Sequence, residues 1–341
     1  TRYWRDWSSD VCSSDLRMKI FFLITIDTEC DKGPGWLLQR PMSFESITQG
    51  IPQILTPLFE EFRLKPTYLL SPEVLTDANC VQTLKACSHA ELGTHLHGEF
   101  IEPEADWEAN RTQTPQIAYT PEVERWKLEN LTTLFSSAFG YPPTSFRAGR
   151  WGMSTATLDI LERLGYLVDS SVCPFRTHSF GNGLEVNYWG APLQPYRPSR
   201  RNLLLTGSHR ILEAPATLGN PSLLYCPRFL LRRLSDRSMI HKKILGKMGR
   251  SAAITWLRPY KSTAAEMIAL SEQYIQAFGK YGKPVFLNMM FHSNEIIPQA
   301  SPYAQTETEL NAYLNSMRHL FIHLSSRYDL EGISLSDVAR L

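Results

Sequence analysis

The feature that most constrains the fold of this chain is an alternation of short apolar runs with longer segments of helical periodicity. The first run, KIFFLITI at 19–26, has almost no polar residue and is typical of a strand covered on both faces. Segment 44–62 then places apolar residues along one helical stripe. Further strands are predicted at 66–70, 91–97, 145–148, 166–172, 211–215 and 284–290, with a short strand and helix near 333–341. Strands that alternate with helices predict a parallel sheet joined by helical crossovers.

The predicted helices between these strands carry recognisable start and stop signals. They are expected at 73–87, 121–139, 154–164, 263–278 and 306–325. Thr120 and Ser154 stand where N-caps belong, and Gly165 stands where a helix ends. Thr263 and Thr306 each open a T-x-x-E capping box. About seven or eight strand–helix units favour an α/β fold, a distorted (β/α) barrel, over a doubly wound open sheet, and both folds place their chemistry at the carboxyl ends of the strands.

The size and charge of the chain limit the classes of function. Residues 18–341 are long enough for a single catalytic domain, and 43% of the chain is hydrophobic, so a sizeable core is expected. The net charge of +1 argues against nucleic acid as a partner, because binding to phosphates leaves a strongly basic footprint. No apolar segment is long enough for a transmembrane helix. Six cysteines without short paired spacing predict free thiols and a reducing, cytoplasmic location.

Two segments depart from the alternation of strands and helices. Residues 1–17 are polar and patternless, resemble a translated adapter sequence and are expected to be non-native, with Met18 as the natural start. Segment 177–260 contains many Pro and Gly residues and is predicted to be a long insertion. Its basic part, 228–250, is interpreted as a solvated helical segment, because charge runs usually face water. A lid, or a docking surface for an anionic glycan or lipid, is the alternative.

Polar residues interrupt the apolar pattern at the end of the first strand, in the sequence Asp27-Thr28-Glu29. Residues i and i+2 of an extended chain point to the same side, so both carboxylates are expected to face one pocket. Two carboxylates this close disfavour joint ionisation unless a cation lies nearby. An acidic loop without function is the alternative, and the position at a strand end favours a functional pair.

The third strand ends in a similar pair, His95-Leu96-His97. The same alternation places both imidazoles on one side of the strand. Two histidines, one carboxylate and a water form a common catalytic zinc site, which makes Glu29, His95 and His97 the candidate ligands of a divalent metal. A lone histidine is more often a structural core residue, whereas two in register favour a metal. Glu99 lies just beyond them and is a competing ligand.

Three other strand ends carry side chains suited to the same site. Arg147 can hold a carboxylate bidentately, and Trp151 offers a flat face for a sugar ring. Asp169 can orient a histidine or bind substrate hydroxyls, and a turn or helix cap is an equally good interpretation. His292 follows the most apolar strand and is a candidate general acid, because the pKa of histidine lies near neutrality. A buried structural histidine is the alternative.

In the order of these five motifs the chain resembles the NodB-type polysaccharide deacetylases, carbohydrate esterase family four, over residues 19–341. The first motif of that family, T-F-D-D, corresponds here to Thr25-Ile26-Asp27-Thr28-Glu29, a D-x-E version that places Glu29 on the metal. The second motif, H-x-x-x-H, corresponds to His95-Leu96-His97, an H-x-H version with Glu99 at the usual second position. His97 and Glu99 both remain open as the further ligand.

The resemblance implies a metal-dependent hydrolase that removes N-acetyl groups from an N-acetylated sugar or polysaccharide precursor, with zinc as the expected metal. Asp27 matches the base of the family, and Arg147 matches the arginine that tethers it. His292 matches the acid, and Asp169 matches the carboxylate that supports the acid. Two other functions stay open. One is hydrolysis of a C–N bond in a small cyclic amide, which a pocket narrowed by segment 177–260 would favour. The other is metal-free glycan binding at a degenerate site.

Overall fold

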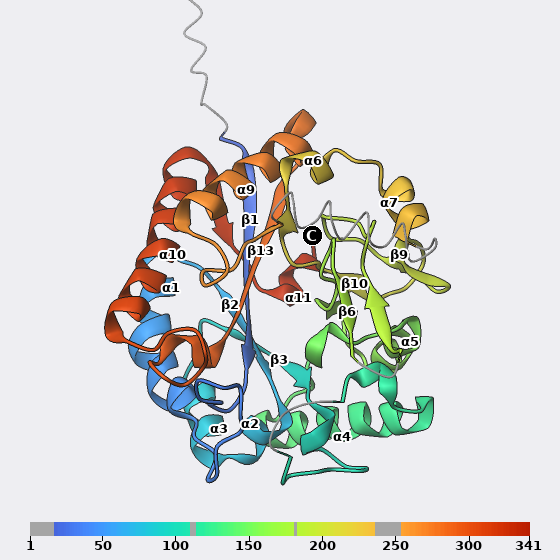
Figure 1. Ribbon diagram of the computed structural model, residues 1–341, viewed down its shortest axis with the longest axis vertical. Coiled ribbons are helices and arrows are strands. Elements are labelled where there is room, and N and C mark those ends of the chain that lie inside the picture. Colours follow the sequence, from blue (N-terminus) through green and yellow to red (C-terminus); the bar gives the residue numbers. More distant parts are fainter. Residues whose placement is uncertain (1–16, 110–113, 181–182, 236–253) are drawn as a thin grey trace, which may run out of the picture.

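The computed structural model describes residues 17–109, 114–180, 183–235 and 254–341, and the other residues are drawn as a grey trace in Figure 1. The predicted leader therefore lies outside the described residues except for Arg17, and so does Cys12. The five other cysteines are free thiols, as predicted. No described helix combines the length and the apolar character needed to cross a membrane.

A parallel sheet forms the centre of the molecule, with β1 and β13 side by side although they come from opposite ends of the chain (Figure 1). The strand order is β10-β5-β4-β3-β2-β1-β13, and β14 pairs with the first half of β1. The strands are β1 (Lys19–Thr28), β2 (Pro66–Leu70), β3 (Glu91–Leu96), β4 (Ser145–Ala148), β5 (Val168–Asp169), β10 (Leu212–Glu213), β13 (Val285–His292) and β14 (Asp329–Gly332). Their pairings are parallel, so their carboxyl ends meet at one edge.

Hydrogen bonds between the two ends of the sheet curl it into a distorted barrel. The Thr217 amide donates to Asn288 O at 3.0 Å, and the Asn288 amide donates to Thr217 Oγ1 at 2.8 Å. Asn288 Nδ2 donates to Ala214 O at 3.0 Å. Asn288 belongs to β13 and Ala214 directly follows β10, so a few hydrogen bonds close the gap between the edge strands without a regular ladder. The predicted barrel is thus confirmed, in place of the doubly wound open sheet.

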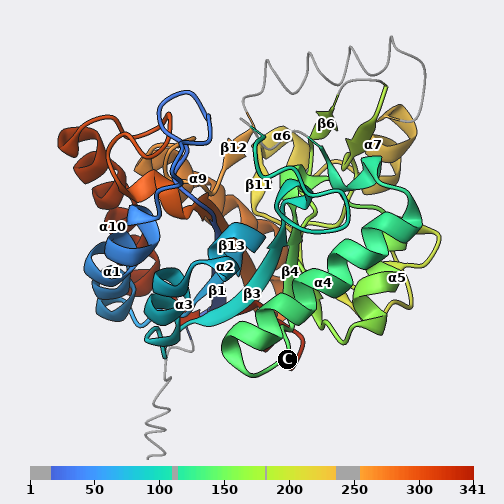
Figure 2. The same ribbon diagram turned by 90° about the horizontal axis from the view of Figure 1, so that it is seen from below.

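Helices surround the strands on the outside of the barrel (Figure 2). They are η1 (Ser46–Leu55), α1 (Thr56–Glu61), α2 (Pro72–Thr76), α3 (Ala78–Lys85), α4 (Pro121–Phe139), α5 (Thr155–Arg163), α9 (Ala264–Phe278) and α10 (Glu307–Arg327). The short helix α11 (Leu335–Val338) instead packs its apolar side chains inside the barrel. The predicted caps are confirmed, because Thr120 caps α4 and reciprocal capping boxes open α5, α9 and α10. These local hydrogen bonds fix where each helix begins.

The residues of β1 separate the apolar interior into two parts. Its even-numbered side chains pack with the covering helices, whereas Phe21 and Leu23 pack inside the barrel with apolar side chains of β2, β5 and α11. Since alternate residues of a strand face opposite sides, the next inward positions are Thr25, Asp27 and Glu29. The inward face therefore changes from apolar at the amino end of the strand to polar at the carboxyl end.

Segment 177–260 forms the predicted insertion, built in its described part from short antiparallel pairs and two short helices that precede and follow the barrel strand β10 in the sequence. Its elements are β6 (Thr177–Ser179), β7 (Glu185–Asn187), β8 (Pro198–Ser199), β9 (Asn202–Thr206), β11 (Leu218–Gly219), β12 (Thr255–Trp256), α6 (Pro221–Leu224) and α7 (Arg228–Ser235). Arg228 Nη2 donates to Leu223 O at 2.7 Å, and Arg232 Nη1 donates to Gly190 O at 2.6 Å. These two arginines of the basic segment thus bind backbone carbonyls, and its remainder from residue 236 lies outside the described residues.

Three predicted strands differ from those observed. The strand expected at 166–172 is limited to the two residues of β5, and the strand expected at 211–215 is limited to the two residues of β10. The reason is that the ladder between these two strands contains only two residue pairs. The strand expected near 333 lies earlier, at β14, and the short helix that follows is α11. Apolar residues beyond these short ladders pack into the core without strand pairing, which composition alone does not reveal.

Candidate active site

The polar residues that follow four of the five apolar runs come together at the carboxyl ends of β1, β3, β4 and β13. Asp27 lies directly beside His292 in the register of β1 and β13, and His95 lies beside Arg147 in the register of β3 and β4. A cavity of about 160 Å³ opens among them. Its lining consists of Asp27, Glu29, Lys32, Trp36, His95, His97, Ala148, Arg150, Trp151 and His292.

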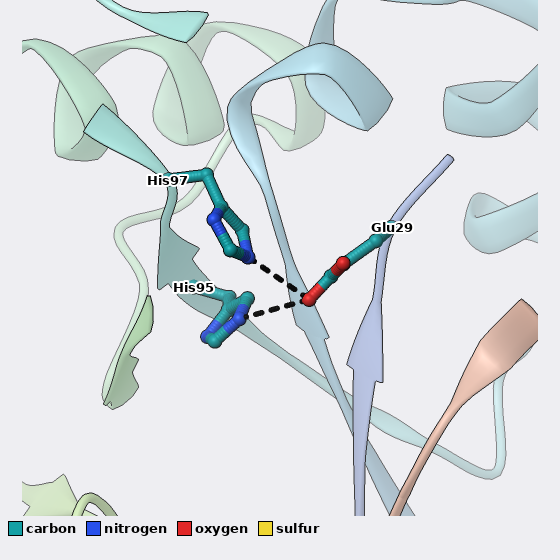
Figure 3. A group of neighbouring side chains, drawn as sticks. All are labelled: Glu29, His95 and His97. Carbon is teal, nitrogen blue, oxygen red and sulfur yellow. Dashed lines mark hydrogen bonds and ion pairs between the residues drawn. The ribbon is translucent and has the colours of Figure 1, made fainter. Parts of the chain in front are cut away.

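Three of these side chains direct one potential ligand atom each toward a common point (Figure 3). Glu29 Oε1 lies 3.2 Å from His95 Nε2 and 2.9 Å from His97 Nε2. Glu29 follows β1, whereas the two histidines come from the end of β3, so the cluster joins two strands separated by β2. All three residues are buried. The expected register of Asp27 with Glu29, and of His95 with His97, is what brings these groups together.

The protonation of His95 shows why a cation fits between these atoms. His95 Nδ1 lies 3.0 Å from the carbonyl oxygen of Arg147, which can only accept, so Nδ1 carries the proton. Burial lowers the pKa of His95 and keeps the ring neutral near pH 7. Its Nε2 lone pair therefore faces Glu29 Oε1, itself an acceptor. Two acceptors at hydrogen-bond distance repel each other unless a proton or a metal ion lies between them, and two imidazoles with one carboxylate suit zinc.

His97 supplies the second imidazole, whereas the competing residue Glu99 faces another group. Burial and the neighbouring His95 both lower the pKa of His97, which favours the neutral, metal-binding form. Glu99 Oε1 accepts a hydrogen bond of 2.8 Å from the Thr114 amide. Among the described residues, the cluster that gathers around Glu29 and His95 contains His97 and not Glu99. The geometry favours His97 as the further ligand.

Asp27 is held by Arg147 at the bottom of the cavity. Arg147 Nη1 donates to Asp27 Oδ1 at 2.7 Å, while Nη2 donates to Thr25 Oγ1 at 2.6 Å and Nε donates to Ser170 O at 2.8 Å. Burial by itself raises the pKa of Asp27, but the positive charges of Arg147 and of nearby histidines outweigh it and hold the pKa well below its usual range. Asp27 is therefore ionised and fixed in one orientation.

His292 lies beside Asp27 on the adjacent strand and turns its Nε2 toward the two carboxylates. His292 Nε2 is 3.8 Å from Asp27 Oδ2 and 3.9 Å from Glu29 Oε1. Its Nδ1 is 2.9 Å from Glu295 Oε1. Glu295 is fully buried and forms an ion pair with Arg258. Burial lowers the pKa of His292, and the hydrogen bond to Glu295 acts in the opposite direction.

The structure places Glu295, and not Asp169, in contact with His292 Nδ1. In β5 the inward positions are Val168, which packs inside the barrel, and Ser170, which contacts Arg147. Asp169 points to the other face, as alternation requires, and accepts hydrogen bonds from the Ser171 amide and hydroxyl at 3.0 and 2.7 Å. Burial raises the pKa of Asp169, which lies beside the equally buried Glu213.

Trp151 forms an aromatic wall of the cavity on a tight turn after β4. Its backbone φ is 61°, and that of Arg150 is 57°, so two residues without glycine's freedom are held in the left-handed region. A Cβ added at Gly149 would lie 2.3 Å from Leu96 O, so only glycine lets this turn approach β3. The guanidinium carbon of Arg147 lies 5.1 Å from the Trp151 ring. The turn thus places an indole next to the catalytic candidates.

Two cavity residues escaped the sequence analysis because they lie in the irregular loop after β1. Lys32 Nζ forms a buried ion pair with Glu29 Oε2, and burial lowers the pKa of Lys32 to about 8. The Trp36 ring lies 5.4 Å from the His292 ring, with a backbone φ of 55°. The sequence Gly33-Pro34-Gly35 indicates a turn, but a turn has no periodicity from which the direction of its side chains follows.

Comparison with known proteins places the fold. Neither models of protein families nor curated protein sequences give a match. Among solved structures, Puue allantoinase has a TM-score of 0.52 at 13% identity, covering 100% of this chain and 97% of its own. A probable polysaccharide deacetylase from Pseudomonas aeruginosa PAO1 has a TM-score of 0.52 at 12% identity, covering 96% of this chain and 91% of its own. A GH57 branching enzyme from Thermococcus kodakaraensis has a TM-score of 0.50 at 10% identity, covering 95% of this chain and 71% of its own.

The barrel and these likenesses together define the class: the chain has the α/β fold of the NodB-type polysaccharide deacetylases. The resemblance drawn from the five motifs is thereby confirmed for the fold. The D-x-E and H-x-H versions of the first two motifs, and the roles of the individual residues, remain predictions.

Proposed function

We propose that the protein is a metal-dependent hydrolase that removes N-acetyl groups from an N-acetylated sugar or polysaccharide precursor, with residues 18–341 as one catalytic domain. The observation that carries this proposal is the convergence of Glu29 Oε1, His95 Nε2 and His97 Nε2 beside the pair of Asp27 and Arg147. Three buried potential ligand atoms within reach of one another offer a site for a cation, and a carboxylate held beside them can take a proton from water.

Glu29, His95 and His97 would hold the metal, for which zinc is the favoured candidate. When bound, such an ion polarises an amide carbonyl and acidifies a water molecule. Asp27 is the general base, because Arg147 fixes its orientation and keeps it ionised. The Arg147 side chain cannot itself accept the proton, so its role is to position the carboxylate.

His292 is the general acid that protonates the leaving amine of the sugar. Because Nδ1 faces Glu295 and Arg258, the proton that reaches the substrate comes from Nε2, the atom that faces the cavity. The hydrogen bond to Glu295 also favours the protonated imidazole. Trp151 offers its indole face to the sugar ring, and a backbone N–H of the same turn is our candidate for oxyanion stabilisation. Asp169 supports the site only through the Ser171 hydroxyl, which accepts from the Ala148 amide.

A cyclic amide is the second candidate substrate, and the small volume of the cavity favours it. About 160 Å³ holds an acetamide group or a small ring, but not a whole sugar chain. The fold likeness to an allantoinase is in keeping with this alternative. The same residues would then act on a ring C–N bond.

Metal-free glycan binding is the third candidate, and the position of Lys32 favours it. The Lys32 ammonium contacts Glu29 Oε2 and so brings a positive charge to the carboxylate. The zinc content of the purified protein distinguishes this alternative from a metal-dependent hydrolase. The free thiols also fit the cytoplasmic location that we propose.

The deciding experiment measures acetate release from N-acetylglucosamine oligomers by the purified protein, with zinc and after treatment with a chelator. We expect release that is lost with the chelator and restored by zinc. Release of ammonia or a ring-opened product from cyclic amides, with no acetate from the oligomers, would favour the second candidate. Full activity after complete metal removal would contradict the proposal.

A further inference from the structure

A second and larger cavity lies next to the catalytic cavity. It has a volume of about 510 Å³, and we call it the tyrosine pocket after Tyr260, Tyr303 and Tyr313, which line it together with Lys261. Ligand pockets in proteins usually measure about 300–1,000 Å³. The catalytic cavity, at about 160 Å³, lies below this range, whereas the tyrosine pocket lies within it. A substrate larger than one acetamido group therefore needs space outside the catalytic cavity.

The two cavities share an aromatic wall. The Trp36 ring, which lines the catalytic cavity, lies 5.4 Å from the His292 ring and 5.5 Å from the Tyr303 ring, which lines the tyrosine pocket. The Arg258 guanidinium lies 5.2 Å from the Tyr303 ring and pairs with Glu295, the partner of His292. A molecule in the tyrosine pocket would thus lie one aromatic side chain away from the catalytic groups.

The lining of the tyrosine pocket suits a sugar ring. The rings of Tyr260 and Tyr303 lie 4.0 Å apart, and Tyr260 is 43% exposed, so an aromatic face remains open to a ligand. Lys261 Nζ lies 5.6 Å from the Tyr260 ring and 5.2 Å from the Tyr303 ring. An aromatic face contacts the C–H groups of a sugar, while an ammonium donates to its hydroxyls or to an acetamido oxygen.

Two carboxylates of the same lining add acceptors, and their own positions are fixed. Glu266 Oε2 accepts from the Thr263 amide at 2.8 Å, and Glu309 Oε2 accepts from the Thr306 amide at 3.1 Å. Both carboxylates belong to capping boxes, so helices α9 and α10 hold them in place. Small side chains, those of Ala264, Ala304 and Ala312, also line the pocket. A donor and fixed acceptors around one pocket match the hydroxyl groups of a carbohydrate.

From these observations we propose that the tyrosine pocket is a sugar subsite. It holds an N-acetylhexosamine unit adjacent to the unit that loses its acetyl group in the catalytic cavity. The inference deepens the proposed function and rests on it for the identity of the reacting unit. It makes the substrate an oligosaccharide, because a single N-acetylated sugar that reacts in the catalytic cavity would leave the tyrosine pocket empty.

Binding measured without turnover tests the subsite. The chelator-treated protein is titrated calorimetrically with N-acetylglucosamine and with its β-1,4-linked tetramer. We expect the tetramer to bind at least about tenfold more tightly than the monosaccharide. Tyr260→Ala should weaken binding of the tetramer about tenfold, which corresponds to the loss of one stacking contact, and change binding of the monosaccharide less than about twofold. Tyr260→Phe should retain most of the affinity for the tetramer.

Tyr225→Ala is the matched control, because Tyr225 is 57% exposed and lies outside the lining of both cavities. It should leave both affinities unchanged. A tetramer that fails to bind, that binds no more tightly than the monosaccharide, or that binds equally well to the Tyr260→Ala protein would overturn the subsite.

Acetate release by the zinc-loaded protein separates the two proposals. If the tetramer releases acetate but its binding does not depend on Tyr260, the proposal of a hydrolase is retained and the proposal of the subsite is contradicted. Binding that depends on Tyr260 without any acetate release would support the subsite and count against the hydrolase.

Discussion

Arg147 Nη1 donates a hydrogen bond of 2.7 Å to Asp27 Oδ1, and both side chains are almost completely buried. The two residues are 120 positions apart in the sequence. The attraction of such a pair roughly offsets the cost of removing both charges from water, whereas one charge left alone is strongly destabilising. The folded site therefore requires that both members be present or both be absent.

Arg147→Met should lower the free energy of unfolding by about 3–5 kcal/mol, because it leaves the Asp27 carboxylate buried without its partner. Acetate release should fall by about 100-fold or more, since the base loses its orientation. The double variant Arg147→Met with Asp27→Asn should recover at least about 2 kcal/mol of stability and remain inactive. Urea denaturation measures the three stabilities. A double variant no more stable than Arg147→Met would show that the pair is not coupled in this way.

Glu295→Gln should lower kcat for acetate release by about tenfold or more. The hydrogen bond to Glu295 raises the pKa of His292 against the effect of burial, so its loss lowers that pKa. A smaller fraction of His292 then carries the proton that the leaving amine needs at neutral pH. Asp169→Asn is the matched carboxylate-to-amide control and should change kcat less than about threefold, since Asp169 points away from the cavity.

Zinc content should be unchanged in both variants, because neither residue is a proposed ligand. A larger loss of kcat in Asp169→Asn than in Glu295→Gln would restore the original assignment of Asp169 as the support of the acid.

His178 should make the stability depend on pH in mildly acidic solution. Burial lowers the pKa of His178 from 6.5 to about 4, so the unfolded chain binds more protons than the folded protein between these values. The contribution of neutral, buried His178 to the stability is therefore fully present above pH 6.5 and is lost as the pH falls toward 4. The difference in pKa sets a ceiling of about 3 kcal/mol, and partial exposure of the ring reduces the expected loss to about 2 kcal/mol.

The His178→Gln variant should lack most of this pH dependence, as measured by urea denaturation at pH 7, 6, 5 and 4. His319→Gln, which changes an exposed histidine on α10, should keep the dependence of the original chain. Equal pH dependence in His178→Gln and the original chain would contradict the account.

The periodicity of the sequence predicted well which strand ends and helix starts surround the site, because these features depend on local rules. The i, i+2 spacing of Asp27 and Glu29 predicted their common direction, and both line the cavity. The capping boxes at Thr263 and Thr306 predicted two helix starts to the residue. Such signals lie within a few residues of the feature that they determine.

The partners of the catalytic candidates could not be predicted in the same way, since they depend on strand register and on loops. The direction of the Asp169 side chain was not predicted, because the length of β5 was overestimated and its inward residues were not known. Glu295 was missed because His292 and Glu295, three residues apart, form part of a short turn that follows no strand pattern. Trp36 reaches the cavity from a Gly- and Pro-containing loop. The sequence carries no simple signal for where such a loop folds back.

The central claim is that Glu29, His95 and His97 share one metal ion, and zinc binding measured by mass spectrometry of the metal content tests it most directly. After equilibration with zinc and removal of excess, we expect about one zinc per chain. Glu29→Gln, His95→Ala and His97→Ala should each weaken binding by about 100-fold or more, and Glu99→Gln should retain the ion. A chain that binds no zinc, or one that still binds zinc after all three ligands have been replaced together, would contradict the account.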